Sequence, residues 1–153
     1  MRSMIIGPRE TMLIPGNVCI EVFEELTGKV LQREVVHNIV TTAGLEELAR
    51  RLVLIVPLQR DMLGVGEGTT APAVTDTGLE TELWRDYVSG AEAGSGLAVW
   101  RYQLPATAIV GATVTEGGLF SHGVLLSRFT HTGIVKSSGL GINYTYQHSL
   151  ANA

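Results

Sequence analysis

The segment from Leu140 to His148 constrains the fold of this chain most strongly. Large side chains occupy every second position of it, and small or polar residues stand between them. A repeat of two residues places the large side chains on one face of a β-strand. The segment therefore predicts a strand with one buried face, whose large residues are Leu140, Ile142, Tyr144, Tyr146 and His148.

Other short stretches with the same repeat indicate that the whole chain is mainly β. A chain of 153 residues is most simply one domain with its own core. We expect a β-sandwich or jelly-roll-like body over residues 17–153, preceded by an extended arm at residues 1–16. Glycine-rich stretches predict an exposed flexible loop at 89–96 and a sharp break at 117–118. The expected strands are 17–24, 29–36, 62–65, 97–104, 109–115, 123–130 and 140–148.

Two helices are expected within this β-rich body. Thr41 or Thr42 can cap the first, amphipathic helix, which we place at about 43–55. A second, short helix is expected at about 77–85, because Asp76 or Thr77 can cap it and Thr77 with Glu80 has the spacing of a capping box.

The first 16 residues combine chain breakers with two apolar triplets. Pro8 and Pro15 interrupt regular structure, whereas a disordered tail would be polar throughout. Two interpretations stay open, an edge strand on the chain's own domain and an arm that adds to a neighbour's sheet. The residues of this expected arm contact are Met4, Ile5, Ile6, Met12, Leu13 and Ile14.

Composition narrows the classes of partner. The net charge of −4 argues against a nucleic-acid-binding protein, which needs clustered Lys and Arg. The sequence lacks an apolar run of about 18 residues, so we expect no membrane span. Charged residues make up only 17% of the chain, which suggests that a partner covers part of its surface. Arg outnumbers Lys, and Arg is better suited than Lys to ion pairs buried in an interface. A high-temperature host could bias the composition in the same way, which would indicate a thermostable protein.

The reactive residue types do not form a recognisable catalytic pattern. Gly64-x-Gly66-x-Gly68 has the wrong spacing for a dinucleotide loop. Ser121 and His122 are adjacent, so in a strand they would point to opposite faces rather than form a nucleophile–base pair. The histidines and the single cysteine, Cys19, share no metal-ligand spacing. We therefore expect no enzyme, no metal and no cofactor.

The aromatic residues could form a ligand platform, but their pattern favours another use. Trp100 and Tyr102 share one strand face, and Tyr144 and Tyr146 share another. Because buried area dominates the energetics of aromatic side chains, we interpret these four residues as core or as a subunit interface.

Several segments resemble a group of virion proteins from tailed double-stranded DNA bacteriophages. HNIVTTAGLEELARRL at 37–52 is similar to the strand-to-helix segment of that group, and GVGEGTTAPAVTDTGLETEL at 64–83 to its loop. VTEGGLFS at 114–121 and GVLLSRFTHTGIVKSSGLGINYTY at 123–146 resemble its C-terminal half, with Gly117 where Ala is usual.

The resemblance implies a viral structural protein, most like a small capsid decoration (cement) protein. Such proteins are typically homotrimers that bind the major capsid protein on the outer surface of the capsid, after assembly in the host cytoplasm. The alternative is a tail-fibre or baseplate component that contacts the host. A glycan hydrolase and a plain carbohydrate-binding module are further readings, although no carboxylate pair stands in a recognisable motif.

Overall fold

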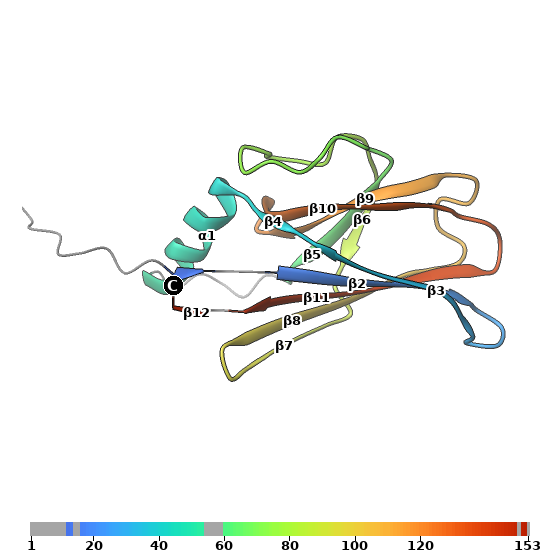
Figure 1. Cartoon of the computed structure of the whole chain (residues 1–153), viewed down its shortest axis with the longest axis horizontal. Helices are drawn as coiled ribbons and strands as arrows, with labels where there is room; N and C mark the ends of the chain where they lie inside the picture. The colour runs from blue at the N-terminus through green and yellow to red at the C-terminus, as the bar shows by residue number, and fades with distance from the viewer. Residues whose placement is uncertain (1–11, 14–15, 54–59, 150, 153) are drawn as a thin grey trace, which may run out of the picture.

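The computed structural model describes residues 12–13, 16–53, 60–149 and 151–152 of the chain. Two five-stranded antiparallel sheets face each other and enclose the core, which confirms the predicted β-sandwich (Figure 1). In chain order the elements are β1 (Met12–Leu13), β2 (Gly16–Glu24), β3 (Val30–His37), β4 (Ile39–Val40), α1 (Thr42–Val53), β5 (Met62–Gly66), β6 (Glu82–Tyr87), β7 (Gly90–Gly94), β8 (Leu97–Leu104), β9 (Thr113–Ser121), β10 (Val124–Val135), β11 (Leu140–Ser149) and β12 (Ala151–Asn152).

The first sheet has the strand order β3-β2-β11-β8-β7, so the strand predicted most clearly lies at its centre. Tyr144 of β11 stands between Ile20 of β2 and Tyr102 of β8. The alternating large residues of β11 point into the sandwich, as the repeat of two residues requires. Each fully buried aliphatic or aromatic side chain contributes roughly 1.5–3 kcal/mol, so these central strands hold much of the core.

The second sheet has the order β4-β10-β9-β5-β6 and closes the other side of the core. Gly117 and Gly118 lie inside β9 and do not break it, which corrects the expectation from the sequence. A side chain at Gly117 would collide with the ring of Phe129 on the adjacent strand. The glycine therefore makes room for a core aromatic residue rather than for a turn.

Helix α1 packs against β10 at one end of the sandwich (Figure 1). Thr41 caps it, as predicted, because its Oγ1 accepts a hydrogen bond from the backbone N–H of Gly44 at 2.9 Å. A side chain at Gly44 would strike the backbone of Leu126, so glycine allows the close approach of helix and strand. A cap of this kind contributes about 1 kcal/mol.

The second predicted helix, at about 77–85, is wrong. Residues 76–81 have no regular structure, and β6 begins at Glu82. The carboxylate expected to cap that helix, Glu80, instead accepts hydrogen bonds from the backbone N–H and the hydroxyl of Thr70 at 2.8 and 2.9 Å. The residue types that favour a helix start are used here in a tertiary contact.

Two further loop and strand assignments also differ from the sequence prediction. The segment 89–96 is not a free loop, because β7 pairs with β8 as a hairpin with Ser95 and Gly96 at its turn. The expected strand at 109–115 begins only at Thr113, because residues 106–111 form turns. Glycine and alanine occur in both segments and allow either outcome, and distant strand pairing decides which one forms.

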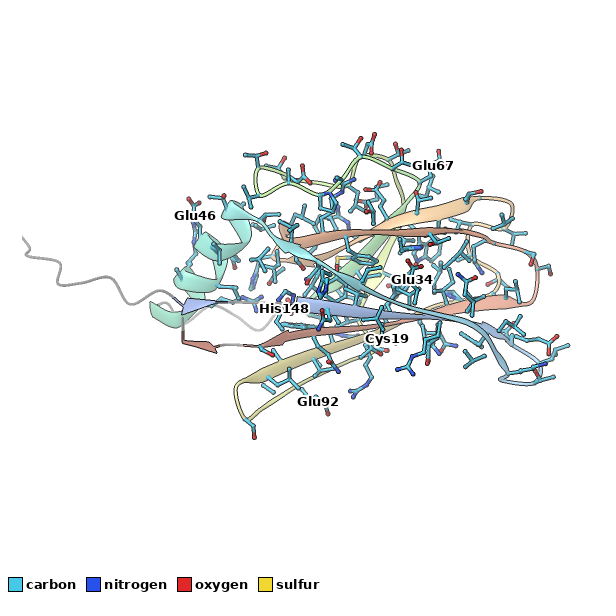
Figure 2. All side chains as sticks on the ribbon, viewed as in Figure 1. Cys19, Glu34, Glu46, Glu67, Glu92 and His148 are labelled. Carbon is cyan, nitrogen blue, oxygen red and sulfur yellow. The ribbon has the colours of Figure 1, made fainter. Side chains whose placement is uncertain are left out.

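The two ends of the molecule along its long axis are built from different elements. At one end lie α1 and a two-stranded pair of β1 with β12. At the other end lie the turn between β2 and β3 and the connection between β10 and β11 (Figure 1). Figure 2 shows Glu46, Glu67 and Glu92 projecting outward, whereas His148 lies within the sandwich. Within the described residues, no helix is long and apolar enough to cross a membrane.

Candidate functional site

The loop of residues 67–81, here called the pinned loop, covers the outer face of the second sheet and is held by one buried carboxylate. Glu116 of β9 is fully buried and accepts hydrogen bonds from three backbone N–H groups of this region. The donors are Gly68 at 3.0 Å, Glu80 at 3.1 Å and Thr81 at 2.8 Å. A single carboxylate therefore fixes both the start and the end of the loop.

Arg128 of β10 completes this anchor from below the loop. Its Nε donates to Glu116 Oε2 at 3.0 Å, and its Nη1 donates to Asp76 Oδ2 at 3.0 Å. Its Nη2 also donates to the carbonyl of Thr70 at 3.1 Å. Burial works to raise the pKa of Asp76, but the N–H of Ala73 and the guanidinium of Arg128 outweigh it and lower that pKa.

Two glycines where the pinned loop begins, Gly66 at the end of β5 and Gly68 in the loop, lie against this carboxylate. A Cβ at Gly66 would lie 2.7 Å from Glu116 Oε1, and a Cβ at Gly68 would lie 2.5 Å from it. Contacts that short are not tolerated, so both positions need glycine. In the glycine repeat at 64–68, Gly66 and Gly68 thus have a structural use, which is to admit the Glu116 carboxylate to the backbone. Gly66 also makes room for the carbonyl of Thr81, whereas a Cβ at Gly64 would meet the side chains of Phe120 and Leu79.

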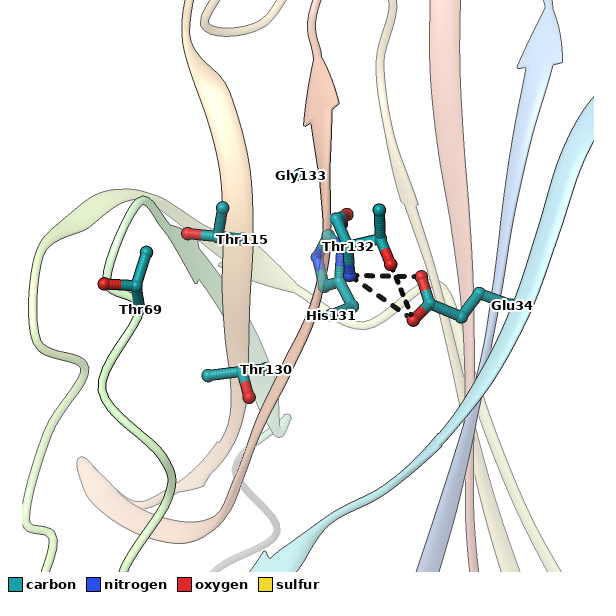
Figure 3. A pocket seen from close by; sticks show the side chains of 7 residues that line it. All are labelled: Glu34, Thr69, Thr115, Thr130, His131, Thr132 and Gly133. Atoms are coloured by element: carbon teal, nitrogen blue, oxygen red, sulfur yellow. Dashed lines mark hydrogen bonds between the residues drawn. The ribbon is translucent and has the colours of Figure 1, made fainter.

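An open pocket beside the pinned loop offers a second candidate site (Figure 3). Its volume is roughly 440 Å³, and hydroxyl groups dominate its lining. Glu34 of β3 reaches across to β10, where it accepts hydrogen bonds from the backbone N–H and the hydroxyl of Thr132. The lining residues are Glu34, Thr69, Thr115, Thr130, His131, Thr132 and Gly133.

The chemistry of this threonine-lined pocket suits hydrogen bonding rather than proton transfer. Thr115 Oγ1 is already engaged, because it donates to the carbonyl of Gly68 at 2.7 Å. The ring of His131 stacks on Phe129, and burial lowers the pKa of this histidine, which favours the neutral imidazole. The Nδ1 of His131 is engaged with the carbonyl of Thr132, and its Nε2 is buried. The pocket can therefore present hydroxyl and carboxylate groups to a polar ligand.

Ser121 and His122 approach each other more closely than the sequence predicted. His122 adopts a positive φ of 49° in the turn after β9, and its Nδ1 lies 3.4 Å from Ser121 Oγ. The same nitrogen lies 3.1 Å from Glu47 Oε1. A serine relay needs one ring nitrogen for the serine and the other for the acid, so this arrangement does not have that geometry.

The surrounding contacts show what this cluster does. Arg51 of α1 donates to Asp61 Oδ1 at 3.1 Å and also contacts Ser121 Oγ. Asp61 accepts a further hydrogen bond from Trp100 Nε1 at 2.7 Å. Charged and polar groups thus join α1 to the end of the sandwich. In the described part of the chain, no group of three or more His, Cys, Asp or Glu residues has a metal-binding arrangement.

The four aromatic residues singled out in the sequence lie in or against the core of the chain itself. Tyr102, Tyr144 and Tyr146 are buried, and Trp100 is half-buried against them. Trp84 Nε1 donates to the hydroxyl of Tyr102 at 2.8 Å, and burial raises the pKa of Tyr102 to about 12. These three tyrosines have no surface to offer a second subunit in this conformation, so the core interpretation fits them better than the interface one.

The predicted arm is described only in part. Met12 and Leu13 form β1, which pairs with β12 of the same chain, Met12 opposite Asn152 and Leu13 opposite Ala151. Met4, Ile5, Ile6 and Ile14 lie outside the described residues. Gly16, assigned to the arm from the sequence, is the first residue of β2.

Sequence reasoning missed the buried charges. Glu116, Arg128 and Lys136 stand in strands or at a strand end, where local pattern predicts solvent-facing positions. The one available signal was their place within the segments at 114–121 and 123–146 that carry the family resemblance.

A comparison with known protein families finds no matching family model, and neither curated proteins nor solved structures give a significant match.

Proposed function

We propose that this chain is a structural protein of a tailed-bacteriophage virion, most like a capsid decoration protein. In this proposal it binds the major capsid protein on the outside of the head as a homotrimer and stabilises the shell. Many weak contacts repeated over a shell raise the barrier to rupture more than any single site could. In this proposal the part of the N-terminal arm that precedes β1, residues 1–11, links neighbouring subunits by adding a strand to an adjacent sheet.

The proposal rests on one observation, which is that the segments resembling the phage virion proteins meet at one place in the fold. Residues from GVGEGTTAPAVTDTGLETEL, VTEGGLFS and LLSR converge on the contact between Glu116 and Arg128. Gly68, Thr81 and Asp76 supply the loop side of that contact. The residues that carry the resemblance thus build a rigid body, which supports a structural role over a catalytic one.

The arm part of the proposal has its own test. Truncation should remove only residues 1–11, because Met12 and Leu13 pair with β12 and Gly16 begins β2. The shortened protein is expected to fold and to form the same oligomer, but to be released from heads more readily. Equal retention of the full and shortened proteins on heads would remove the arm from the account.

A tail-fibre or baseplate protein that contacts the host is the second candidate. The threonine-lined pocket favours it, because hydroxyl groups and the Glu34 carboxylate can bind the hydroxyls of a glycan. Binding to a glycan array, lost on Thr130→Val substitution and kept in Thr75→Val, would support this candidate. Thr75 lies in the pinned loop and outside the pocket lining.

Antibody labelling of intact virions separates the two candidates. Gold particles distributed over the whole head are expected for a decoration protein. Label confined to the tail or to one vertex would contradict the proposal and favour the second candidate. Particles from which the gene has been deleted provide the control for antibody specificity.

A further inference from the structure

Three connections at the end of the sandwich far from α1 are tied into one rigid unit, here called the loop tip. They are residues 25–29, 105–112 and 136–139. The backbone N–H of Glu25 donates to the carbonyl of Gly139 at 2.8 Å, which joins the first connection to the third. The N–H of Gly111 donates to the carbonyl of Lys136 at 2.7 Å, which joins the second to the third.

A buried lysine reinforces the loop tip from inside. Lys136 is shielded from solvent, and its ammonium donates to the carbonyls of Pro105 at 3.1 Å and Ala106 at 3.2 Å. It also contacts the carbonyl of Leu140. Two carbonyls of the 105–112 connection and the carbonyl of the first residue of β11 thus converge on one charge. Such pre-organisation lowers the entropy cost of binding, because the loops are already ordered.

Apolar side chains project into solvent from the loop tip and from Val135, the last residue of β10, which directly precedes its third connection. Leu26 is 96% exposed, Val135 is 63% exposed and Val110 is 54% exposed. Val110 and Val135 flank the hydrogen-bonded pair Gly111 and Lys136, so they lie at the same end of the sandwich. Single exposed apolar residues are ordinary, but a group of them on a fixed loop cluster indicates an interaction surface.

The backbone beside Val110 is strained. Ile109 has a positive φ of 42°, which is unusual for a β-branched residue. Its side chain packs against the core, while the next residue, Val110, faces outward. Strain of this kind costs on the order of 1–3 kcal/mol and concentrates at functional sites.

We infer that the loop tip, together with the adjoining Val135, is the surface that docks on the shell, where Leu26, Val110 and Val135 insert into an apolar recess rimmed by Lys or Arg. The inference rests on the proposed function, because it names the part of this chain that would contact the capsid. Glu24 and Glu25 directly precede Leu26, and Lys29 is the only other charge in that turn. Basic groups on the partner would complement this balance of charge.

The same charges argue against other occupants. A symmetric tip-to-tip contact between two copies would bring Glu25 near its own counterpart, which is unfavourable. An anionic membrane surface would be repelled by the acidic turn and by the net charge of −4. The pairing of β1 with β12 lies at the opposite end of the long axis, so arm and tip could act at the same time (Figure 1).

The test compares two variants of the full-length protein. The first, here called the tip variant, combines Leu26→Asp in the loop tip with Val135→Asp at the end of β10 beside it. The control is Val74→Asp in the pinned loop, where Val74 is also exposed. Binding is measured by co-sedimentation with heads purified from a phage that lacks this gene. We expect the tip variant to bind about tenfold more weakly or worse, as for the loss of a central apolar anchor, and the control to bind within about twofold of the unsubstituted protein.

Each other outcome has a defined meaning. Equal binding of the tip variant and the unsubstituted protein to heads overturns the loop-tip inference and leaves the proposed function standing. Failure of the unsubstituted protein to bind heads overturns the proposed function, and the shell as partner with it. Loss of self-association in the tip variant, or binding of the unsubstituted protein to phosphatidylserine vesicles, overturns the inference in favour of a second copy or of a membrane. Matching thermal unfolding of the variants shows that both are folded.

Discussion

Arg128 Nε donates a hydrogen bond to Glu116 Oε2 at 3.0 Å, and both side chains are buried beneath the pinned loop. The two residues stand on adjacent strands, β9 and β10, and the loop closes over them. Moving two charged groups from water into the protein interior is costly, and their mutual attraction alone does not offset that cost. The pair is therefore stabilised by the further hydrogen bonds that both side chains make to the pinned loop. The contact therefore links the fold of the sheet to the shape of the loop.

Substitution of Glu116 by Gln should unfold the pinned loop and destabilise the protein strongly. The change removes the buried carboxylate that pairs with Arg128 and accepts hydrogen bonds from three backbone N–H groups, while Arg128 keeps its pair with Asp76. Breaking a buried ion pair costs about 3–5 kcal/mol in the free energy of unfolding. Urea unfolding measures the effect. The matched control is Glu92→Gln, whose ion pair with Arg101 is exposed and should change stability by less than about 1 kcal/mol. Equal losses in the two variants would contradict the anchoring role of Glu116.

Substitution of Gly68 by Ala tests the close approach of the loop to the carboxylate. The new Cβ would lie 2.5 Å from both Glu116 Oε1 and Glu80 Cβ, so the loop must shift. We expect a loss of about 1–3 kcal/mol and faster hydrogen exchange at residues 66–81. Gly78→Ala is the control, because a Cβ there meets nothing within 4 Å. Exchange rates that are the same in both variants would contradict this explanation of the glycines.

Stability should fall as the pH falls, because of His148. Burial lowers the pKa of His148 to about 4, and its Nε2 lies 2.9 Å from the Asn38 amide nitrogen. The folded state thus resists protonation, whereas the unfolded chain binds a proton near pH 6.5. The stabilisation is complete above about pH 6.5 and is lost as the pH falls to about 4, by about 3 kcal/mol.

Urea unfolding at a series of pH values measures this dependence. The lowered pKa of His131 adds to the loss in the same direction. His148→Asn should therefore flatten the curve between pH 6.5 and 4 without abolishing its slope. A variant curve parallel to that of the unsubstituted protein would show that His148 does not carry the effect.

Substitution of Lys136 by Met should loosen the loop tip. The carbonyls of Pro105, Ala106 and Leu140 would lose a charged donor, and hydrogen bonds to charged groups contribute about 1.5–3 kcal/mol. Hydrogen exchange at 105–112 and thermal unfolding both report the change. Lys29→Met, at an exposed position, is expected to leave both measurements unchanged. Unaltered exchange in the Lys136 variant would contradict the rigid loop tip.

The features predicted correctly from the sequence are those that local pattern determines. The alternation of β11 follows from residues two positions apart, and it placed Tyr144 and Tyr146 on one buried face. The cap of α1 follows from Thr41 and a residue three positions later. In both cases the physical cause acts within a few residues, so a single sequence shows it.

The features predicted wrongly depend on partners far along the chain. Asp76 and Glu80 have the character of helix caps, but Arg128, 52 residues after Asp76, holds Asp76 in the loop instead. Gly117 looks like a chain break until Phe129 of the neighbouring strand is placed over it. The pinned loop and the loop tip arise from such distant contacts, so the sequence could not locate either surface.

The most direct test of the account is the number of copies of this protein in a purified virion. Quantitative mass spectrometry can compare it with the major capsid protein and with a tail protein in the same sample. A capsid decoration role predicts that the number of copies is of the same order as that of the major capsid protein. It also predicts that the protein is lost when heads are stripped of decoration. A number as low as that of a tail protein, with retention on isolated tails, would contradict it.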